Sequence, residues 1–263
     1  ALQIHPLPKI PRGEAATRER AALTNNDALL KALEREANKG PFDLVYERYS
    51  LWSCAGMDYA CEQKIPCVLE VNAPLLEEQI SARTLINRAA AEDIAMRAFR
   101  AATVITAVSR QLGHVLEQHP SARGKVHVIP NAVNAERFMS VNPSLPKNGS
   151  FVIGFVGTLR ASQGLTKLIE AFAVVAEQSP RPQLLIVGDG PDREQLDREI
   201  AARDLIPRVR FTGSVAPEAV PGLLASMDAA VAPYPALAQF YGSPLKVYEY
   251  MAAALPIVAS RIG

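Results

Sequence analysis

The residue types best suited to chemistry in this 263-residue chain occur together near its end. Ser243 followed by Pro244 predicts the start of a helix, because serine caps helix N-termini and proline is favoured at the first helical position. Free backbone N–H groups at such an end suit a phosphate, and Lys246 would add a full positive charge in the first turn. Glu249 follows at i+3 on the same face, where a carboxylate could accept hydrogen bonds from sugar or ribose hydroxyls. The alternative is a surface helix whose Lys and Glu pair in solvent.

Two further segments place glycines between a predicted strand and a predicted helix. In residues 154–164, glycine would let a bound group approach the backbone closely, and Arg160 could hold a diphosphate with two hydrogen bonds. In the second segment, Gly188 and Gly190 could line a nucleotide, and Asp189 could cap the next helix. Glycine also occurs in such turns for purely steric reasons, so each segment alone leaves that alternative open.

Composition excludes several classes of function. With 28 Lys and Arg against 27 Asp and Glu, the net charge of +1 offers no basic surface for nucleic acid. The three cysteines, Cys54, Cys61 and Cys67, form neither a disulfide framework nor a zinc pattern, and the four histidines do not cluster in sequence. No apolar run is long enough to span a bilayer, and the first residues lack the order of a signal peptide. We therefore expect a cytoplasmic protein without a metal.

Short apolar runs alternate with helical patterns along the chain, which predicts parallel sheets covered by helices on both faces. Predicted strands are residues 43–46, 67–71, 103–108 and 126–129 in the first half, and 151–156, 183–187, 208–211, 229–232 and 256–259 in the second. Predicted helices are a segment ending near Gly40, then 52–63, 75–100 and 110–117, followed by helices that begin near residues 163, 191, 217 and 243. The proline- and glycine-bearing stretch 140–150 is interpreted as a linker. The predicted domains are therefore residues 1–148 and 149–263.

Five ordered segments resemble glycosyltransferase family 4, whose members are retaining enzymes of the GT-B fold. The segments are residues 126–134 with Phe138, 151–172, 186–191, 209–213 and 249–260, and the resemblance covers nearly the whole chain. It extends to the Ser-Pro-Leu-Lys…Glu-Tyr-Met-Ala signature of one subgroup of the family. The resemblance implies two Rossmann-like domains facing a cleft, both incomplete in this chain, with the acceptor-side domain first and the nucleotide-sugar-binding domain second.

The resemblance also implies roles for particular residues. Asn72 and Glu249 would be catalytic. The donor diphosphate and sugar would contact Gly157, Thr158, Arg160, Gln163, Gly164, Ser243, Pro244, Leu245 and Lys246. The nucleotide would contact Gly188, Asp189, Gly190, Thr212, Gly213, Val215 and, through its ribose, Glu249. No metal and no further cofactor are implied.

The chain departs from the family pattern at three places. Thr158 and Gln163 stand where the family often has an arginine and a lysine, and Arg160 is shifted by two positions. Tyr241 stands where the first of two glutamates usually serves the transferred sugar. Asn72 occupies the position where the first domain often has histidine. These changes indicate a variant site.

The expected function is hexosyl transfer from a nucleotide-diphosphate sugar to a hydroxyl of a glycan or lipid-linked acceptor, with retention, in cell-envelope polysaccharide synthesis. A weak peripheral contact of residues 75–100 with the inner face of the membrane is a further hypothesis. One alternative is a GT-B sugar-nucleotide epimerase, which would need additional acid–base residues. The other is a non-catalytic nucleotide-sugar-binding protein, which the missing sugar-side glutamate could suggest.

Overall fold

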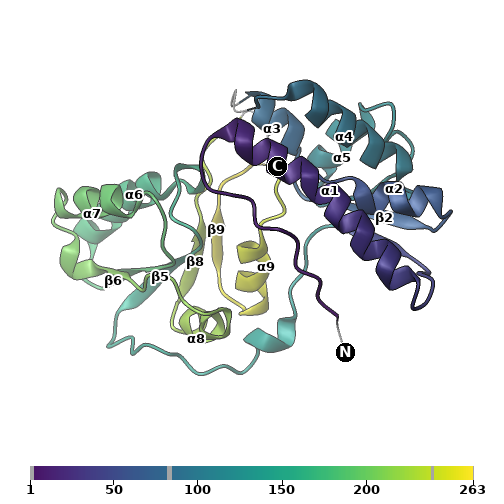
Figure 1. The fold of residues 1–263 in the computed structure, drawn as a ribbon. Coiled ribbons are helices and arrows are strands. Elements are labelled where there is room, and N and C mark those ends of the chain that lie inside the picture. Colours follow the sequence, from purple (N-terminus) through teal and green to yellow (C-terminus); the bar gives the residue numbers. More distant parts are fainter. Residues whose placement is uncertain (1–2, 82–84, 238–239, 263) are drawn as a thin grey trace. The chain divides into compact units, whose positions relative to one another are not determined.

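The computed structural model describes residues 3–81, 85–237 and 240–262, and these fold into two compact units (Figure 1). The first unit comprises Ala1–Pro130 together with Tyr241–Ser243. The second comprises Asn131–Phe240 and Pro244–Gly263. Both are built on a parallel sheet, as the alternation of strands and helices predicts.

The sheet of the first unit has the order β1-β2-β3-β4, and all its pairings are parallel. Its strands are β1 (Val45–Arg48), β2 (Cys67–Val71), β3 (Val104–Ala107) and β4 (Val126–Val128). Its helices are α1 (Ala15–Ala37), α2 (Ala55–Glu62), α3 (Leu75–Ser81), α4 (Arg88–Ala101) and α5 (Arg110–Glu117). Side chains of the sheet and of the helices meet in one core, in which Leu69, Ile105 and Leu112 are fully buried. Removing such apolar area from water is the main source of stability for the unit.

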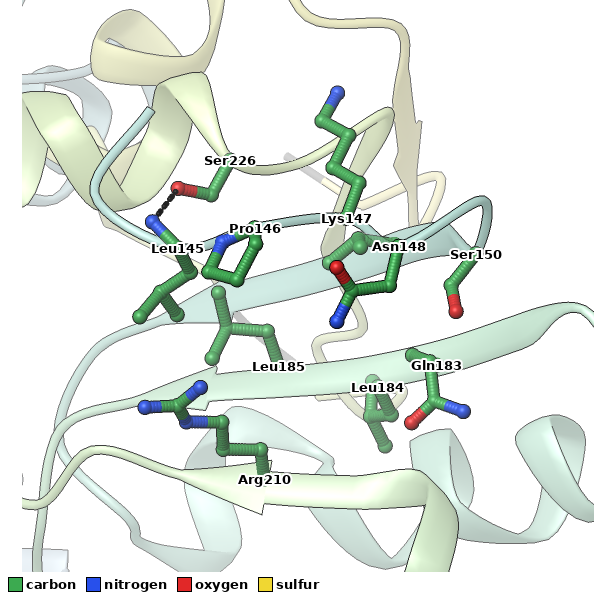
Figure 2. Close-up of a pocket in the computed structure, with 11 residues that line it drawn as sticks. Leu145, Pro146, Lys147, Asn148, Ser150, Gln183, Leu184, Leu185, Arg210 and Ser226 are labelled. Carbon is green, nitrogen blue, oxygen red and sulfur yellow. Dashed lines mark hydrogen bonds between the residues drawn. The ribbon is translucent and has the colours of Figure 1, made fainter. Parts of the chain in front are cut away.

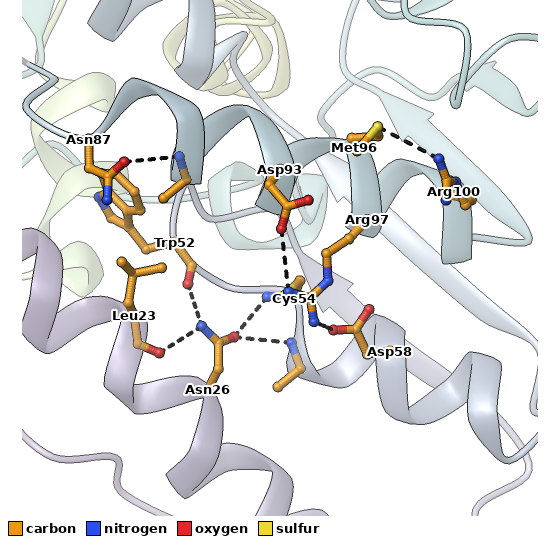
Figure 3. A network of polar contacts seen from close by, with 12 residues as sticks. Leu23, Asn26, Trp52, Cys54, Asp58, Asn87, Asp93, Met96, Arg97 and Arg100 are labelled. Atoms are coloured by element: carbon orange, nitrogen blue, oxygen red, sulfur yellow. Dashed lines mark hydrogen bonds and ion pairs between the residues drawn. The ribbon is translucent and has the colours of Figure 1, made fainter.

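Asn26 joins α1 to the start of α2 (Figure 3). Its Oδ1 accepts hydrogen bonds from the backbone N–H groups of Cys54, at 2.9 Å, and Ala55, at 3.1 Å. Its Nδ2 donates to the carbonyls of Leu23 and Trp52. One amide side chain thus satisfies free N–H groups at a helix start and fixes the neighbouring helix against it.

The helix predicted over residues 75–100 is two helices, α3 and α4. Glu19 explains part of the break, because its buried carboxylate accepts from the backbone N–H groups of Ile86 and Asn87 at 2.9 Å. Asn87 then caps α4 by accepting from Ala90 N at 3.1 Å. Residues 82–84 lie outside the described residues. None of the helices in the described part of the chain is long and apolar enough to cross a membrane.

The sheet of the second unit has the order β7-β6-β5-β8-β9, again with parallel pairings. Its strands are β5 (Phe151–Val156), β6 (Pro182–Val187), β7 (Val209–Phe211), β8 (Ala229–Ala232) and β9 (Ile257–Ala259). Its helices are α6 (Leu165–Gln178), α7 (Arg193–Ala201), α8 (Val220–Ala225) and α9 (Leu245–Ala252), with 3₁₀ turns at Ala135–Phe138, Ala161–Gln163, Ile206–Arg208 and Pro217–Ala219.

Alternate residues of β6 enter two different cores, which shows that both faces of this sheet are covered. Leu184 and Ile186 pack with α6 and α7, whereas Leu185 and Val187 pack with α8, α9 and the Ala135–Phe138 turn. Successive side chains of a strand point to opposite faces, so a continuous apolar run such as β6 is buried on both.

The division between the units lies after Pro130, not at residue 148 as predicted. Residues 131–148 belong to the second unit because Phe138 and Leu145 pack into its core, and Ser144 N donates to Gly222 O at 2.9 Å. The prediction took prolines and a glycine as signs of a linker, although this stretch is a packed loop. Conversely, Tyr241–Ser243 groups with the first unit, where Ser109 Oγ donates to Tyr241 O at 2.6 Å.

Most predicted strands agree with the structure within a residue or two at each end. The first differs most, because β1 begins at Val45 rather than at residue 43. Its register with β2 explains the shift: Val45 lies beside Cys67, and Val45 N donates to Pro66 O. Ser109 caps α5, since its Oγ accepts from Leu112 N at 3.1 Å.

Candidate functional site

Two glycine-bearing turns lie side by side at the carboxyl edge of the second sheet. They follow β5 and β6, which run parallel with Val156 beside Val187. Gly157 N donates to Val187 O at 2.9 Å, and Leu159 N donates to Asp189 O at 3.0 Å. A parallel α/β sheet binds ligands at this edge, so the turns lie where a binding site is expected.

Gly188 is required sterically in this arrangement. Its φ is +131°, and a Cβ built on it would stand 2.1 Å from Gly157 O. A Cβ on Gly190 would likewise stand 2.4 Å from Leu159 O. The missing side chains therefore allow two backbones to touch, and in this structure the steric explanation accounts for both glycines.

A third predicted segment joins the same edge. Gly188 N donates to Gly213 O at 3.1 Å, and the Thr212 hydroxyl donates to the same oxygen at 2.8 Å. Val215, two residues further on, packs against the core that contains Leu185 and Val187. Thr212 and Gly213 thus neighbour the Gly188 turn, while Val215 contributes to packing. Their contact with a nucleotide stays a prediction.

Two predicted helix caps are wrong. Pro244 is the N-cap of α9 and Leu245 its first residue, so Ser243 precedes the helix rather than capping it. Asp189 does not cap α7, because the N-cap of that helix is Asp192. Instead, Asp189 Oδ1 accepts from Gly190 N at 2.8 Å. In both cases the helix begins later than the sequence pattern indicates.

Lys246 extends from α9 to the first glycine turn. Its Nζ donates to Gln163 Oε1 at 2.6 Å and lies 3.9 Å from the centroid of the Phe155 ring. The Tyr234 ring is 5.5 Å away. Burial lowers the pKa of Lys246 to about 7, against a smaller opposing effect of Glu249. No carboxylate forms an ion pair with this ammonium among the residues that the structure describes. The arrangement is a cation held by neutral partners, which suits the binding of an anion.

Other residues predicted to bind the donor sugar nucleotide lie on the first glycine turn and at the start of α6. Gly164 has a φ of +70°, and a Cβ on it would meet Pro233 O at 1.7 Å, so the start of α6 lies against the segment that carries Tyr234. Thr158 and Arg160 are exposed near the turn. The side chain of Arg160 has no hydrogen bond or ion pair within the described ranges, and it is therefore available to a ligand.

Glu249 lies one turn after Lys246 and is half-buried. Burial raises the pKa of Glu249, and the charges of Arg137 and Lys246 counteract this only in part. Arg137 comes from the Ala135–Phe138 turn, where its guanidinium donates to Pro217 O at 3.1 Å. The second unit thus holds a carboxylate and two cations on one side of α9.

Asn72 belongs to the first unit and follows β2 directly. Its Nδ2 donates to Glu70 Oε1 at 2.8 Å, while the Tyr46 hydroxyl donates to Glu70 Oε2 at 2.9 Å. Asn72 therefore lies at the carboxyl edge of its own sheet, in a polar cluster. Its catalytic role, like that of Glu249, remains a prediction.

Several residues of the site were missed by sequence reasoning. Phe155 and Tyr234 provide the rings beside Lys246. Tyr250 is fully buried, and its hydroxyl accepts from Val156 N at 2.8 Å, directly before Gly157. Phe155 and Tyr250 fit apolar patterns for a strand and a helix, so their types alone indicated packing.

A hollow of about 300 Å³ lies at the opposite, amino-terminal end of β5 and β6 (Figure 2). Residues 145–148 form one wall, anchored by Leu145 N donating to Ser226 Oγ at 3.0 Å. Gln183 and Arg210 line the sheet side. This hollow is separate from the glycine turns. In the part of the chain that the structure describes, no group of three or more His, Cys, Asp or Glu residues could hold a metal.

Comparison with protein families matches both parts of the chain. Residues 3–137, about half of its length, match the family model described as Glycosyltransferase Family 4. The chain belongs to glycosyltransferase family 4. Residues 150–263 match the model described as Glycosyl transferases group 1. The chain therefore has the two parallel-sheet, Rossmann-like domains of a GT-B glycosyltransferase.

Curated relatives of this family 4 chain carry glycosyltransferase names. The 2-deoxystreptamine glucosyltransferase of Streptomyces kanamyceticus is 28% identical over 173 residues, which cover 62% of this chain and 44% of that protein. The putative teichuronic acid biosynthesis glycosyltransferase TuaH of Bacillus subtilis is 27% identical over 221 residues, which cover 81% of this chain and 52% of that protein. The chain spans about half the length of the curated relatives that it matches.

Among solved structures, the fold of this family 4 chain is similar to that of the Anabaena protein HepE in complex with UDP. The TM-score is 0.69 at 22% identity, and the match covers 90% of this chain and 64% of that one. HepE has also been solved with UDP and glucose and with UDP-glucose. At this identity the likeness shows the shared fold alone.

Proposed function

We propose that this family 4 chain takes part in hexosyl transfer from a nucleotide-diphosphate sugar to a hydroxyl acceptor, with retention and without a metal. The observation that carries the proposal is the environment of the Lys246 ammonium. A partly buried ammonium costs free energy unless a charge compensates it, and among the residues that the structure describes a neutral amide and two aromatic rings contact its Nζ. A diphosphate would supply the missing negative charge.

Arg160 supplies a second cation for the same ligand in this proposal. It is exposed at the glycine turn, where the guanidinium can bind a diphosphate with two hydrogen bonds. Together, Arg160 and Lys246 would stabilise charge as it develops on the leaving nucleotide. Glu249 would hold the ribose hydroxyls, and Asn72 would act from the acceptor side.

A uridine nucleotide is the first donor to test, since the similar structure of HepE holds UDP and, separately, UDP-glucose. The Ser-Pro-Leu-Lys…Glu-Tyr-Met-Ala segment favours the subgroup that carries this signature. A glycan or lipid-linked acceptor at the cytoplasmic side of the membrane is proposed. The name of TuaH, a putative teichuronic acid biosynthesis enzyme, supports a cell-envelope glycan.

The test is calorimetric titration with UDP, GDP and ADP in the presence of EDTA. We expect one nucleotide to bind, and Lys246→Ala to weaken it at least tenfold with the fold retained. Lys167→Ala is the matched control, because Lys167 lies exposed on α6 and pairs only with Glu170 in the described residues. If no nucleotide binds, the proposal is wrong. Binding without turnover of any donor would favour the non-catalytic alternative.

A further inference from the structure

The ammonium of Lys246 is held in place by an uncharged acceptor, the side-chain amide of Gln163. Gln163 Oε1 accepts from Nζ at 2.6 Å, and the Phe155 ring lies 3.9 Å from Nζ on another side. Gly157 closes a third side, where a Cβ would approach Nζ to 2.7 Å. These three contacts come from the Ala161–Gln163 turn, β5 and the turn after β5. Lys246 is therefore positioned before any ligand binds.

Among the described residues, few charged or titratable groups lie near this ammonium. On α9 itself, Glu249 acts on it through its charge only. Tyr234 faces it from the segment after β8, and burial raises the pKa of that phenol, which keeps it neutral. Arg137, on the Ala135–Phe138 turn, acts on Glu249. The described neighbours on β5 and the Ala161–Gln163 turn that contact Nζ carry no charge. Lys246 is thus oriented without an ion pair among the described residues.

We propose that Gln163 is a positioning residue for the donor diphosphate: its amide oxygen fixes the ammonium of Lys246 while leaving its charge available. This inference rests on the proposed function of the site. A glutamate at position 163 would make an ion pair that the diphosphate has to displace. A lysine there would repel Lys246, and a residue without an acceptor would leave the flexible side chain free to move.

Proton uptake follows from the same geometry. Burial lowers the pKa of Lys246 to about 7, so above that pH the free protein carries mainly the neutral amine. A bound diphosphate favours the ammonium and raises this pKa. Binding of UDP above pH 7 therefore takes up a proton, and the affinity falls as the pH rises. A glutamate at position 163 would raise the pKa of Lys246 in the free protein, so the uptake would disappear.

The experiment titrates UDP into the wild-type chain, Gln163→Met and Gln163→Glu, at about pH 8 in buffers of different ionisation enthalpy. Methionine keeps the shape of the side chain and removes the acceptor, and we expect about a tenfold loss of affinity for the loss of a charged hydrogen bond. Gln163→Glu should weaken binding at least as much and abolish proton uptake. Gln178→Glu, the same chemical change at the exposed end of α6, should leave both quantities unchanged.

Each result separates the two ideas. Wild-type affinity and wild-type proton uptake in both Gln163 variants would overturn the positioning role. The donor site would still stand if Lys246→Ala weakens the binding of UDP. Proton uptake retained in Gln163→Glu would likewise overturn it. If the wild-type chain binds none of UDP, GDP and ADP, the proposed function fails, and this inference fails with it.

Discussion

A Cβ atom at position 157 would stand 2.7 Å from the Nζ of Lys246 and 3.3 Å from its Cε. Gly157 also has a φ of +151°, a region that L-residues rarely adopt. The glycine therefore provides both the space and the backbone conformation that bring the lysine to the turn. This close approach joins Gly157, directly after β5, to Lys246 on α9.

Gly157→Ala should weaken nucleotide binding by about tenfold or more, because the new methyl group displaces the ammonium. Thermal unfolding measures any loss of stability, and UDP titration measures the loss of affinity. Gly13→Ala is the control, since Gly13 has a φ of +140° but nothing within 4 Å of its added Cβ. Equal UDP affinity in wild type and Gly157→Ala would contradict the crowding argument.

Lys246→Met should change how stability depends on pH. The pKa of Lys246 is about 7 in the folded protein, against an ordinary value of 10.5. Between these values the unfolded wild-type chain binds more protons than the folded one, so its free energy of unfolding rises with pH. The methionine variant lacks this contribution. Its stability advantage should be largest below pH 7 and shrink toward pH 10.

Urea unfolding of both proteins at about pH 6 and about pH 9.5 checks this expectation. The folded pKa sets the lower end of the window and the ordinary pKa its upper end. A constant difference between the two proteins across that range would show that Lys246 titrates normally in the folded state.

Tyr250→Phe should destabilise the second unit by about 1–3 kcal/mol, because Val156 N would lose its buried acceptor. The Tyr250 hydroxyl accepts from Val156 N at 2.8 Å and lies 3.4 Å from Val231 O, to which it donates. Tyr46→Phe is the matched control, since the Tyr46 hydroxyl is on an exposed side chain of the first unit. Equal small losses in both variants would argue against the role given to Tyr250.

Asn26→Ala should destabilise the first unit by about 2–4 kcal/mol, because two N–H groups lose their acceptor and two carbonyls each lose one donor. Hydrogen exchange of the Cys54 and Ala55 amides reports this directly, and both should exchange faster. Asn25→Ala removes one exposed bond to Pro8 O and should have little effect. Unchanged exchange at Cys54 and Ala55 would contradict the capping role.

Glu249→Gln should lower turnover more than it lowers nucleotide affinity, if the carboxylate acts mainly as transfer proceeds. Because burial raises the pKa of Glu249, wild-type turnover should also begin to fall at a higher pH on the acid side than for an exposed glutamate. Steady-state kinetics and UDP titration on the same samples provide the comparison. Equal losses of turnover and affinity would leave Glu249 as a binding residue only.

The sequence predicts most of this fold because buried parallel strands are short and continuously apolar. β5 and β6 are examples, since both faces of each are covered. The same reasoning fails for residues 140–150. Their prolines and glycine indicate irregular backbone, but only the fold shows that Leu145 packs into a core. The break between α3 and α4 depends on the distant Glu19, which local helical periodicity does not reveal.

The candidate site is predicted less completely than the fold. Turns after parallel strands share an edge, so Gly157 and Gly188 could be expected to lie close together. The contact between Gln163 and Lys246 joins residues 83 positions apart, and no local pattern contains it. Ser243 shows the opposite error, because a good capping residue next to a proline does not decide which residue begins the helix.

The interlocked glycine turns limit how this donor region can be re-engineered. Gly188 and Gly190 leave room for the backbone of Gly157 and Leu159, so neither turn has its shape independently of the other. A turn grafted alone from a relative would meet a mismatched neighbour. Chimeras that exchange both turns together should express and fold more often than chimeras that exchange either one. Among natural relatives, substitutions in one turn should accompany substitutions in the other.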